Sequence, residues 1–228
     1  MGELAASLAH ELKQPLTAIL ANAQAAERFL AADATNPAEV REILQDIVND
    51  DKRAGEVIDR MRQLVKKEEP EFVSFNVDSV IADVALLTHS DAILHNIRVS
   101  LAIDSGLPPI RGDRVELQQV LLNLLLNSFD AMMDTPANER EIQVWAKRHG
   151  QRFLRVSVRD RGMGLSRDKL NFIFEPFYTT KRNGLGMGLS ISRSIIEAHG
   201  GQLWATNNPD CGATFSFTVP VDGVQYSA

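Results

Sequence analysis

The spacing of apolar residues changes near residue 70, and this change constrains the fold more than any other feature of the sequence. Between Leu4 and Leu30, apolar residues recur at steps of three and four, the pattern of one face of an α-helix. Pro15 interrupts this helix and is expected to bend it. A second helix is predicted from Pro37 to Val65, with Asn36 as its N-cap and Glu39 as the capping-box partner.

The two predicted helices form a hairpin that carries one long apolar stripe. A hairpin cannot enclose this stripe by itself, because each helix covers the other on one side only. A second copy of the chain gives the simplest cover, since four such helices make a closed bundle. We therefore predict a homodimer built on a four-helix bundle.

After the charged residues 66–70, strands and helices are mixed. Alternating apolar and polar residues predict strands at 98–103, 142–147, 154–159, 202–206 and 214–219. Helices are predicted at 77–87, at 114–133 behind an Asp113/Glu116 capping box, and at 189–199. Helices and strands in this proportion imply a two-layer α/β sandwich with a mixed sheet. The fold class is then α+β, with a helical domain at 1–69 and a sandwich domain at 70–228.

Composition excludes several classes of protein. A formal net charge of -6 argues against non-specific binding to nucleic acid or anionic lipid. Cys211 is the one cysteine and cannot form an internal disulfide, which removes the small secreted class, and no Cys/His set has zinc spacing. No apolar run approaches the roughly 18 residues of a membrane span. We expect a cytoplasmic chain that makes no membrane contact and carries no export signal.

A carboxylate and two glycines follow directly on the strand predicted to end at Arg159. Asp160 can accept a hydrogen bond from an exocyclic amine, while Gly162 and Gly164 let a flat ring approach the backbone. A strand followed by a glycine turn without any ligand would give the same match.

A second group of glycines, Gly184, Gly186 and Gly188, precedes the helix predicted from Leu189. Free N–H groups at the positive end of a helix suit polyphosphate, and Lys181 stands beside them. The spacing is neither a Rossmann fingerprint nor a P-loop. A surface connection that binds nothing remains the alternative.

Two amides, Asn123 and Asn127, lie four residues apart within an apolar helix. They should emerge on the same face, where they need hydrogen-bond partners. One reading is helix-to-loop hydrogen bonding. The other is that an amide oxygen binds a Mg²⁺ ion carrying nucleotide phosphates, because this cation prefers oxygen ligands.

His10 differs from the other histidines by its neighbours. Glu11 supplies a carboxylate that could orient or deprotonate the ring, and Gln14 lies one turn further along the helix. The carboxamide of Gln14 could orient a water molecule for hydrolysis, with an ordinary solvated side chain as the alternative. The remaining histidines are expected to be ordinary surface residues: His89, His95, His149 and His199.

Taken together, these segments resemble the transmitter core of a sensor histidine kinase of two-component signalling. The resemblance covers nearly the whole chain, and the short segment between Phe177 and Gly184 resembles the nitrogen-fixation and dicarboxylate-sensing branch. The motifs occur in the family's order: the H-box around His10, the N-box with Asn123 and Asn127, the first glycine box 160–164, the F-box 174–177, the second glycine box 184–188 and a final 212–215.

The resemblance implies a dimerisation and histidine-phosphotransfer domain followed by a gyrase-like ATP-binding domain. It implies that His10 accepts the phosphoryl group of ATP, with Glu11 as its base, and passes it to an aspartate of a response regulator. At the nucleotide site the resemblance implies that Asn127 coordinates Mg²⁺, that Asn123 supports the phosphates and that Asp160 binds the adenine amine. It implies that Gly162 and Gly164 line the base pocket and that Thr214 lies near the base through a water. The residues implied to form the lid are Lys181, Gly184, Gly186 and Gly188.

The expected activity is therefore ATP-dependent autophosphorylation on histidine, with regulator dephosphorylation as a further activity. Two alternatives from other classes remain. One is a regulator-binding scaffold without kinase activity, and the other is a gyrase-type ATPase clamp. The second is disfavoured because related ATPases carry a glutamate at the place of Asn123.

Overall fold

The computed structural model describes residues 2–31, 37–65, 71–166, 170, 172–179 and 186–223, without the side chains of 2–14, 31, 52–53 and 55–65. The chain divides into two compact units, Met1–Glu69 and Pro70–Ala228. We call them the hairpin unit and the sandwich unit, and each is described by itself.

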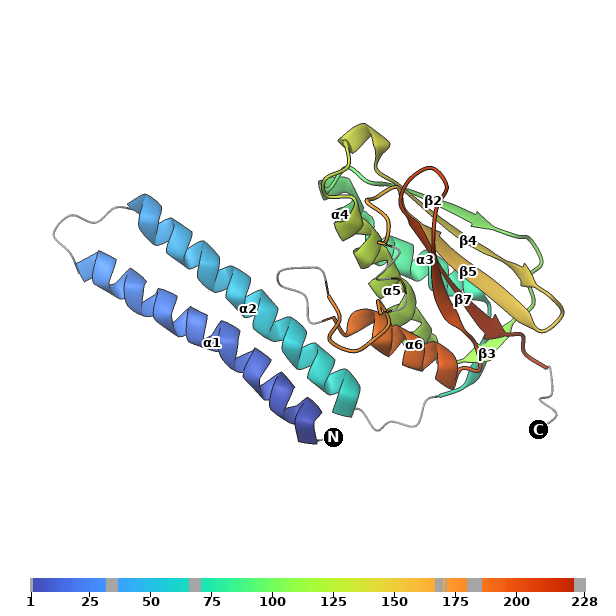
Figure 1. Ribbon diagram of the computed structural model, residues 1–228, viewed down its shortest axis with the longest axis horizontal. Helices are drawn as coiled ribbons and strands as arrows, with labels where there is room; N and C mark the ends of the chain where they lie inside the picture. Colours follow the sequence, from blue (N-terminus) through green and yellow to red (C-terminus); the bar gives the residue numbers. More distant parts are fainter. Residues whose placement is uncertain are drawn as a thin grey trace. The chain divides into compact units, whose positions relative to one another are not determined.

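The hairpin unit consists of two long helices, α1 (Gly2–Ala31) and α2 (Pro37–Val65). They lie side by side and run in opposite directions (Figure 1). Pro15 lies inside α1, which continues on both sides of it. Ala26 and Ala54 are buried in this unit, whereas Leu20 and Leu30 are 59% and 63% exposed. The predicted hairpin is confirmed, and much of its apolar surface is not covered by the hairpin itself.

The sandwich unit is built on a mixed sheet of five strands with the order β2-β4-β5-β7-β6. β2 pairs parallel with β4, and every other neighbouring pair in this sheet is antiparallel. A separate ribbon joins β1 to β3. The strands are β1 (Val73–Phe75), β2 (Arg98–Ile103), β3 (Ile110–Gly112), β4 (Glu141–His149), β5 (Phe153–Arg159), β6 (Leu203–Asn207) and β7 (Ala213–Pro220).

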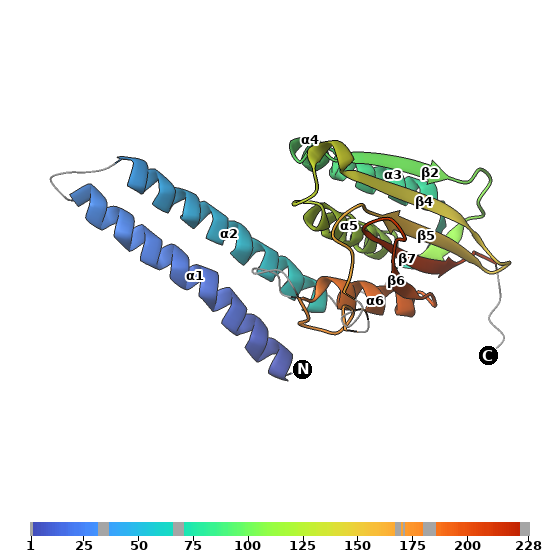
Figure 2. The same cartoon turned by 45° about the horizontal axis from the view of Figure 1, so that its top comes forward.

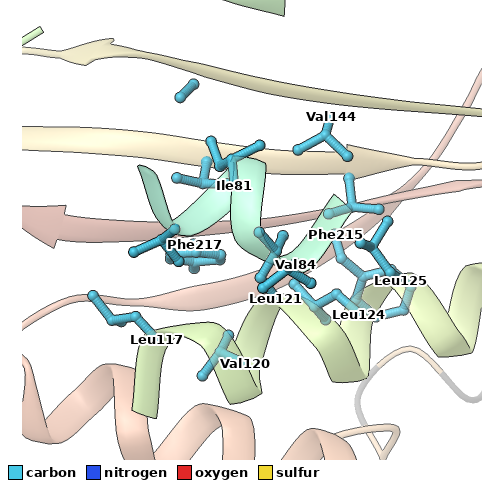
Figure 3. Close-up of a cluster of buried hydrophobic side chains, with 14 of the residues drawn as sticks. Ile81, Val84, Leu117, Val120, Leu121, Leu124, Leu125, Val144, Phe215 and Phe217 are labelled. Carbon is cyan, nitrogen blue, oxygen red and sulfur yellow. The ribbon is translucent and has the colours of Figure 1, made fainter. Parts of the chain in front are cut away.

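Helices cover one face of this sheet, as both views show (Figures 1 and 2). The helices of the unit are α3 (Val77–Leu87), α4 (His89–Leu94), α5 (Arg114–Ala131), the 3-10 turn η1 (Ala137–Glu139) and α6 (Gly188–Ala198). Between α3, α5 and the sheet lies the apolar core (Figure 3). Val84 of α3, Leu124 of α5 and Val144 of β4 meet there and are almost fully buried. The two-layer sandwich predicted from the sequence is thus confirmed.

The hydrogen bonds at the start of α5 differ from those of the predicted capping box. Asp113 is the N-cap, and its Oδ1 accepts from the N–H groups of Val115 (2.9 Å) and Glu116 (3.1 Å). The N–H of Asp113, which a capping box would give to Glu116, donates instead to Nε2 of His199 at 2.9 Å. The cap therefore ties α5 to the end of α6.

His199 was predicted to be a surface residue, and that prediction is wrong. The residue is 3% exposed and its ring stacks on Phe72 with centroids 4.8 Å apart. Because Nε2 faces the N–H of Asp113, it must be the acceptor, so the ring proton sits on Nδ1, 2.8 Å from the carbonyl oxygen of Ile195. His199 joins three segments that are far apart in the sequence.

Among the described residues, none of the helices is both long enough and apolar enough to cross a membrane.

Candidate functional site

Asp160 lies at the centre of the candidate site, directly after β5. Its side chain is 2% exposed. Oδ1 accepts hydrogen bonds from the N–H groups of Gly162 (2.9 Å) and Ala213 (3.2 Å). Within the described residues both of these bonds fall on Oδ1, and a carboxylate has further acceptor capacity on its second oxygen, Oδ2.

Burial controls the charge of this carboxyl. Desolvation raises the pKa of Asp160 above its ordinary value, because an ionised carboxylate loses hydration inside the protein. The N–H groups of Gly162 and Ala213, and the charge of Arg159, act in the opposite direction without cancelling the effect. A buried carboxylate that is held by backbone donors is a strong acceptor for a neutral donor group.

The turn before β7 approaches Asp160 so closely that a side chain cannot fit. A Cβ atom on Gly212 would lie 2.6 Å from Oδ1 of Asp160 and even closer to its carbonyl oxygen, and the residue has a φ of +75°. Only glycine satisfies both conditions at low cost. Gly212 belongs to a motif noted in the sequence, yet its packing against Asp160 was not predicted.

Thr214 was expected to reach the same ligand as Asp160, but the sheet register separates them. Thr214 pairs with Arg159, and Asp160 follows Arg159 in the chain. Since successive residues of a strand point to opposite faces, Thr214 and the Asp160 carboxylate lie on opposite faces of the sheet. The Thr214 hydroxyl donates instead to Oδ1 of Asn208 at 2.6 Å. The structure thus brings Ala213, and not Thr214, to Asp160.

Asn123 and Asn127 share one face of α5, as their spacing predicts. Nδ2 of Asn127 lies 3.4 Å from Oδ1 of Asn123, and Nδ2 of Asn123 donates to the hydroxyl of Ser192 at 3.0 Å. Ser192 lies in α6 and was not anticipated. Gly188, the first residue of α6, packs against the same amide, because a Cβ there would lie 3.0 Å from Cγ of Asn123. The N-box and the second glycine box are therefore in direct contact.

The first glycine box rests on the last turn of the same helix. The N–H of Met163 donates to the carbonyl oxygen of Ala131 at 3.2 Å, and a Cβ on Gly162 would collide with that residue. From Asp160 the site therefore continues over the end of α5 to Asn127 and Asn123. Gly164 lies beside Asn207, and Gly186 packs against Phe177 and Tyr178 of the F-box region.

Several predicted site residues cannot be compared with this geometry. Lys181 and Gly184 lie outside the described residues. His10, Glu11 and Gln14 fall within α1, but their side chains also lie outside the described part of the chain.

The chemistry of the donors indicates what the site could hold. In the described part of the chain, no group of three His, Cys, Asp or Glu side chains is placed to hold a metal ion. A divalent cation bound here would take amide oxygens from α5 and further oxygens from a phosphorylated ligand. Mg²⁺ fits this set, since it is usually held by few protein ligands together with substrate phosphates.

Two family models match the chain. The His Kinase A (phospho-acceptor) domain matches residues 1–70, and the Histidine kinase-, DNA gyrase B-, and HSP90-like ATPase family matches residues 112–223. The sensor protein FixL of Bradyrhizobium diazoefficiens is 39% identical over 221 residues, which is 96% of this chain and 43% of that protein. The chain spans less than half the length of the curated relatives it matches.

Solved structures agree with these matches. The catalytic domain of histidine kinase ThkA is 35% identical with a TM-score of 0.60, covering 66% of this chain and 96% of that one. ThkA in complex with response regulator protein TrrA is 28% identical with a TM-score of 0.72, covering 96% and 61%. Full-length ShkA in complex with AMPPNP is 25% identical with a TM-score of 0.69, covering 98% and 47%. The chain therefore belongs to the sensor histidine kinases, and it carries their phospho-acceptor helices followed by their ATPase-type catalytic domain.

Proposed function

We propose that this chain phosphorylates His10 with ATP and passes the phosphoryl group to an aspartate of a response regulator. The observation that carries the proposal is the buried carboxylate of Asp160, held on a glycine-lined wall that continues to the amides of α5. Burying a carboxylate without a partner would cost folding free energy. A carboxylate that accepts a hydrogen bond from the exocyclic amine of a ligand has a functional reason to be buried.

In this proposal Asp160 selects adenine. The adenine amine donates to Oδ2, while Gly162 and Gly164 leave room for the flat base. Guanine carries a carbonyl oxygen at the corresponding position, and two acceptors facing one another would repel. The buried carboxylate therefore favours ATP over GTP.

The phosphates would lie toward the junction of α5 and α6. The N-terminus of α6 supplies backbone N–H groups and a positive dipole end, with Gly186 and Gly188 beside it. We assign Lys181 and Gly184 to the same lid from the sequence. Asn127 would hold Mg²⁺, with Asn123 supporting the phosphates, and the bound ion would offset their negative charge.

The proposed step transfers the γ-phosphoryl group to the ring of His10. Glu11 keeps the ring proton on Nδ1, which leaves the lone pair on Nε2. A bond forms between Nε2 and phosphorus, the bond from phosphorus to the bridging oxygen breaks, and ADP leaves. Glu11 then accepts the Nδ1 proton. His10 and Asp160 belong to different compact units, so this step needs residues from both of them.

Phosphohistidine formation is the direct test. The purified chain is incubated with γ-labelled ATP and Mg²⁺, and the label is then challenged with acid and with alkali. We expect an acid-labile, alkali-stable label that is lost in His10→Ala and kept in His89→Ala, a matched control at an exposed position of α4. Label that persists in His10→Ala would refute the assignment. Nucleotide binding without any label would favour the scaffold alternative.

The metal role of Asn127 has a separate test. Asn127→Ala should weaken binding of Mg-ATP by more than it weakens binding of ATP in the presence of a chelator. Equal losses under both conditions would remove Asn127 as a metal ligand.

We also propose that the hairpin unit pairs with a second copy of itself. Leu16, Leu20, Leu30 and Leu44 are each more than half exposed in a single chain, although they are large and apolar. Such a surface is typical of an interface, and a four-helix bundle would cover it. Sedimentation should give a dimer for the parent chain and a monomer for Leu20→Asp. A monomeric parent chain would refute the proposal.

Dephosphorylation of the regulator is a second candidate activity. It is favoured by the helical course of α1, which puts Gln14 one turn after His10. Gln14→Ala should slow the loss of phosphate from a phosphorylated regulator while leaving autophosphorylation intact. An unchanged rate of regulator dephosphorylation would eliminate this role.

The response regulator is proposed as the partner because ThkA has been solved with one. Dependence on ATP makes the cytoplasm the proposed compartment. No nucleic-acid partner is proposed.

A further inference from the structure

Two successive asparagines, Asn207 at the end of β6 and Asn208 directly after it, hold the two ends of residues 160–165, which are the first glycine box and the residue after it. Asn208 bonds to Asp160, where residues 160–165 begin, and Asn207 bonds to Leu165, where they end. Neither asparagine belongs to a motif noted in the sequence.

Asn208 fastens the turn between β6 and β7 to the end of β5. Its Nδ2 donates to the carbonyl oxygens of Asp160 and Cys211, both at 2.9 Å, and its Oδ1 accepts from Thr214. Two carbonyl partners fix which end of the amide is nitrogen. Nearby, Arg159 donates to both carboxylate oxygens of Asp210, at 2.6 and 2.7 Å. These hydrogen bonds therefore hold the turn between β6 and β7 in place.

Asn207, directly before this turn, holds the end of residues 160–165 at Leu165. Its Nδ2 donates to the carbonyl oxygen of Leu165 at 2.6 Å, and its Oδ1 accepts from the N–H of Leu165 at 2.7 Å. One amide side chain thus satisfies both backbone polar groups of one residue, as a neighbouring strand would.

The segment between these two attachments has a high conformational freedom of its own. It contains Gly162 and Gly164, and Gly164 has a φ of +71°. Glycine loses more backbone freedom on ordering than other residues do. If the segment were released at Leu165, a ligand would have to order it on binding, and its affinity would fall accordingly.

We propose that Asn207 is a positioning residue for the nucleotide reaction, which keeps residues 160–165 in the binding conformation before ATP arrives. The proposal rests on the proposed function, since it assumes that these residues form the wall of an adenine site. Asn207 acts through the backbone of Leu165 and is not assigned any contact with the phosphates. Its effect should therefore fall on affinity and not on phosphoryl transfer.

The test compares Asn207→Ala and Asn207→Asp with Thr206→Ala, a matched control at an exposed position of the same strand. ATP affinity is measured by calorimetry, and KM and kcat by autophosphorylation. We expect Asn207→Ala to raise both Kd and KM about tenfold, equivalent to about 1.4 kcal/mol, with kcat at saturating ATP within twofold of the parent. Thr206→Ala should match the parent.

The variant Asn207→Asp tests separately the two hydrogen bonds between Asn207 and Leu165. It keeps an acceptor for the Leu165 N–H but puts a carboxylate oxygen against the Leu165 carbonyl, so its affinity should fall at least as far as that of the alanine variant. It also supplies the test if Asn207→Ala does not fold.

The outcomes distinguish the two proposals. A parent chain that binds no adenine nucleotide would overturn the proposed function itself. A parent chain that binds ATP, together with an Asn207 variant whose Kd lies within twofold of it, would overturn the positioning role alone. A fall in kcat with unchanged KM would also overturn it, because that pattern reports a loss of active protein.

Discussion

Replacement of His199 by phenylalanine tests the link between α5, α6 and Phe72. The substitution keeps an aromatic ring against Phe72 and removes both ring nitrogens. The N–H of Asp113 then loses its acceptor in a partly buried place, which costs about 1–3 kcal/mol. The carbonyl of Ile195 keeps the N–H of residue 199 as a partner, so losing the ring bond costs about 1 kcal/mol. Together we expect a loss of roughly 2–4 kcal/mol in the free energy of unfolding.

Tryptophan emission during urea unfolding measures this loss. Trp145 and Trp204 are the chain's two tryptophans and both lie in the sandwich unit, so their emission follows that unit alone. In thermal unfolding, a loss of this size should lower Tm by roughly 4–16 °C. His149→Phe, at an exposed end of β4, is the matched control. A change of less than about 0.5 kcal/mol in His199→Phe would refute the reasoning, because such a change is typical of surface substitutions.

Two further predictions concern the nucleotide site. Because burial raises the pKa of Asp160, acidification through that raised pKa should protonate Oδ2 and weaken ATP binding at a higher pH than an ordinary aspartate would, as calorimetry at stepped pH can show. The effect on stability is opposite: in the ligand-free protein the ionised form lowers the free energy of unfolding above the folded pKa, and this cost shrinks as the pH falls from the folded pKa and is absent below the ordinary, unfolded-state pKa. The variant Asp160→Asn, which has no titrating group at this position, should show neither effect. Gly188→Ala should push the Asn123 amide away from Ser192 and lower ATP affinity about tenfold by loss of one well-placed hydrogen bond, and an unchanged Kd would contradict the packing.

The sequence predicted the longer elements well because each carries several periods of its pattern. The bounds of α3 and β2 agree with those predicted, and the other four strands of the main sheet differ by one or two residues at their ends. The strands β1 and β3 and the helix α4 were missed. β1 and β3 have three residues each, which is too short for alternation to be recognised. The family prediction is confirmed by the comparisons.

The shared helix face of Asn123 and Asn127 could be predicted, because their spacing in the sequence fixes it, whereas the hydrogen bond from Gly162 to Asp160 was not predicted. Sequence reasoning missed contacts between distant segments, as for the burial of His199 under Phe72. Roles assigned to His10 and Lys181 stay predictions.

The division into two units also affects the order in which the chain acquires structure. The contacts of α1 with α2 form between segments that are close in the sequence, whereas β5 must wait for β7 before its second edge is paired. Local contacts form faster than distant ones, and during synthesis the N-terminal part emerges first. The hairpin can therefore fold, and expose its apolar side chains, while the sandwich unit is still incomplete on the ribosome. Association of two nascent chains at this stage would join subunits before either could bind ATP.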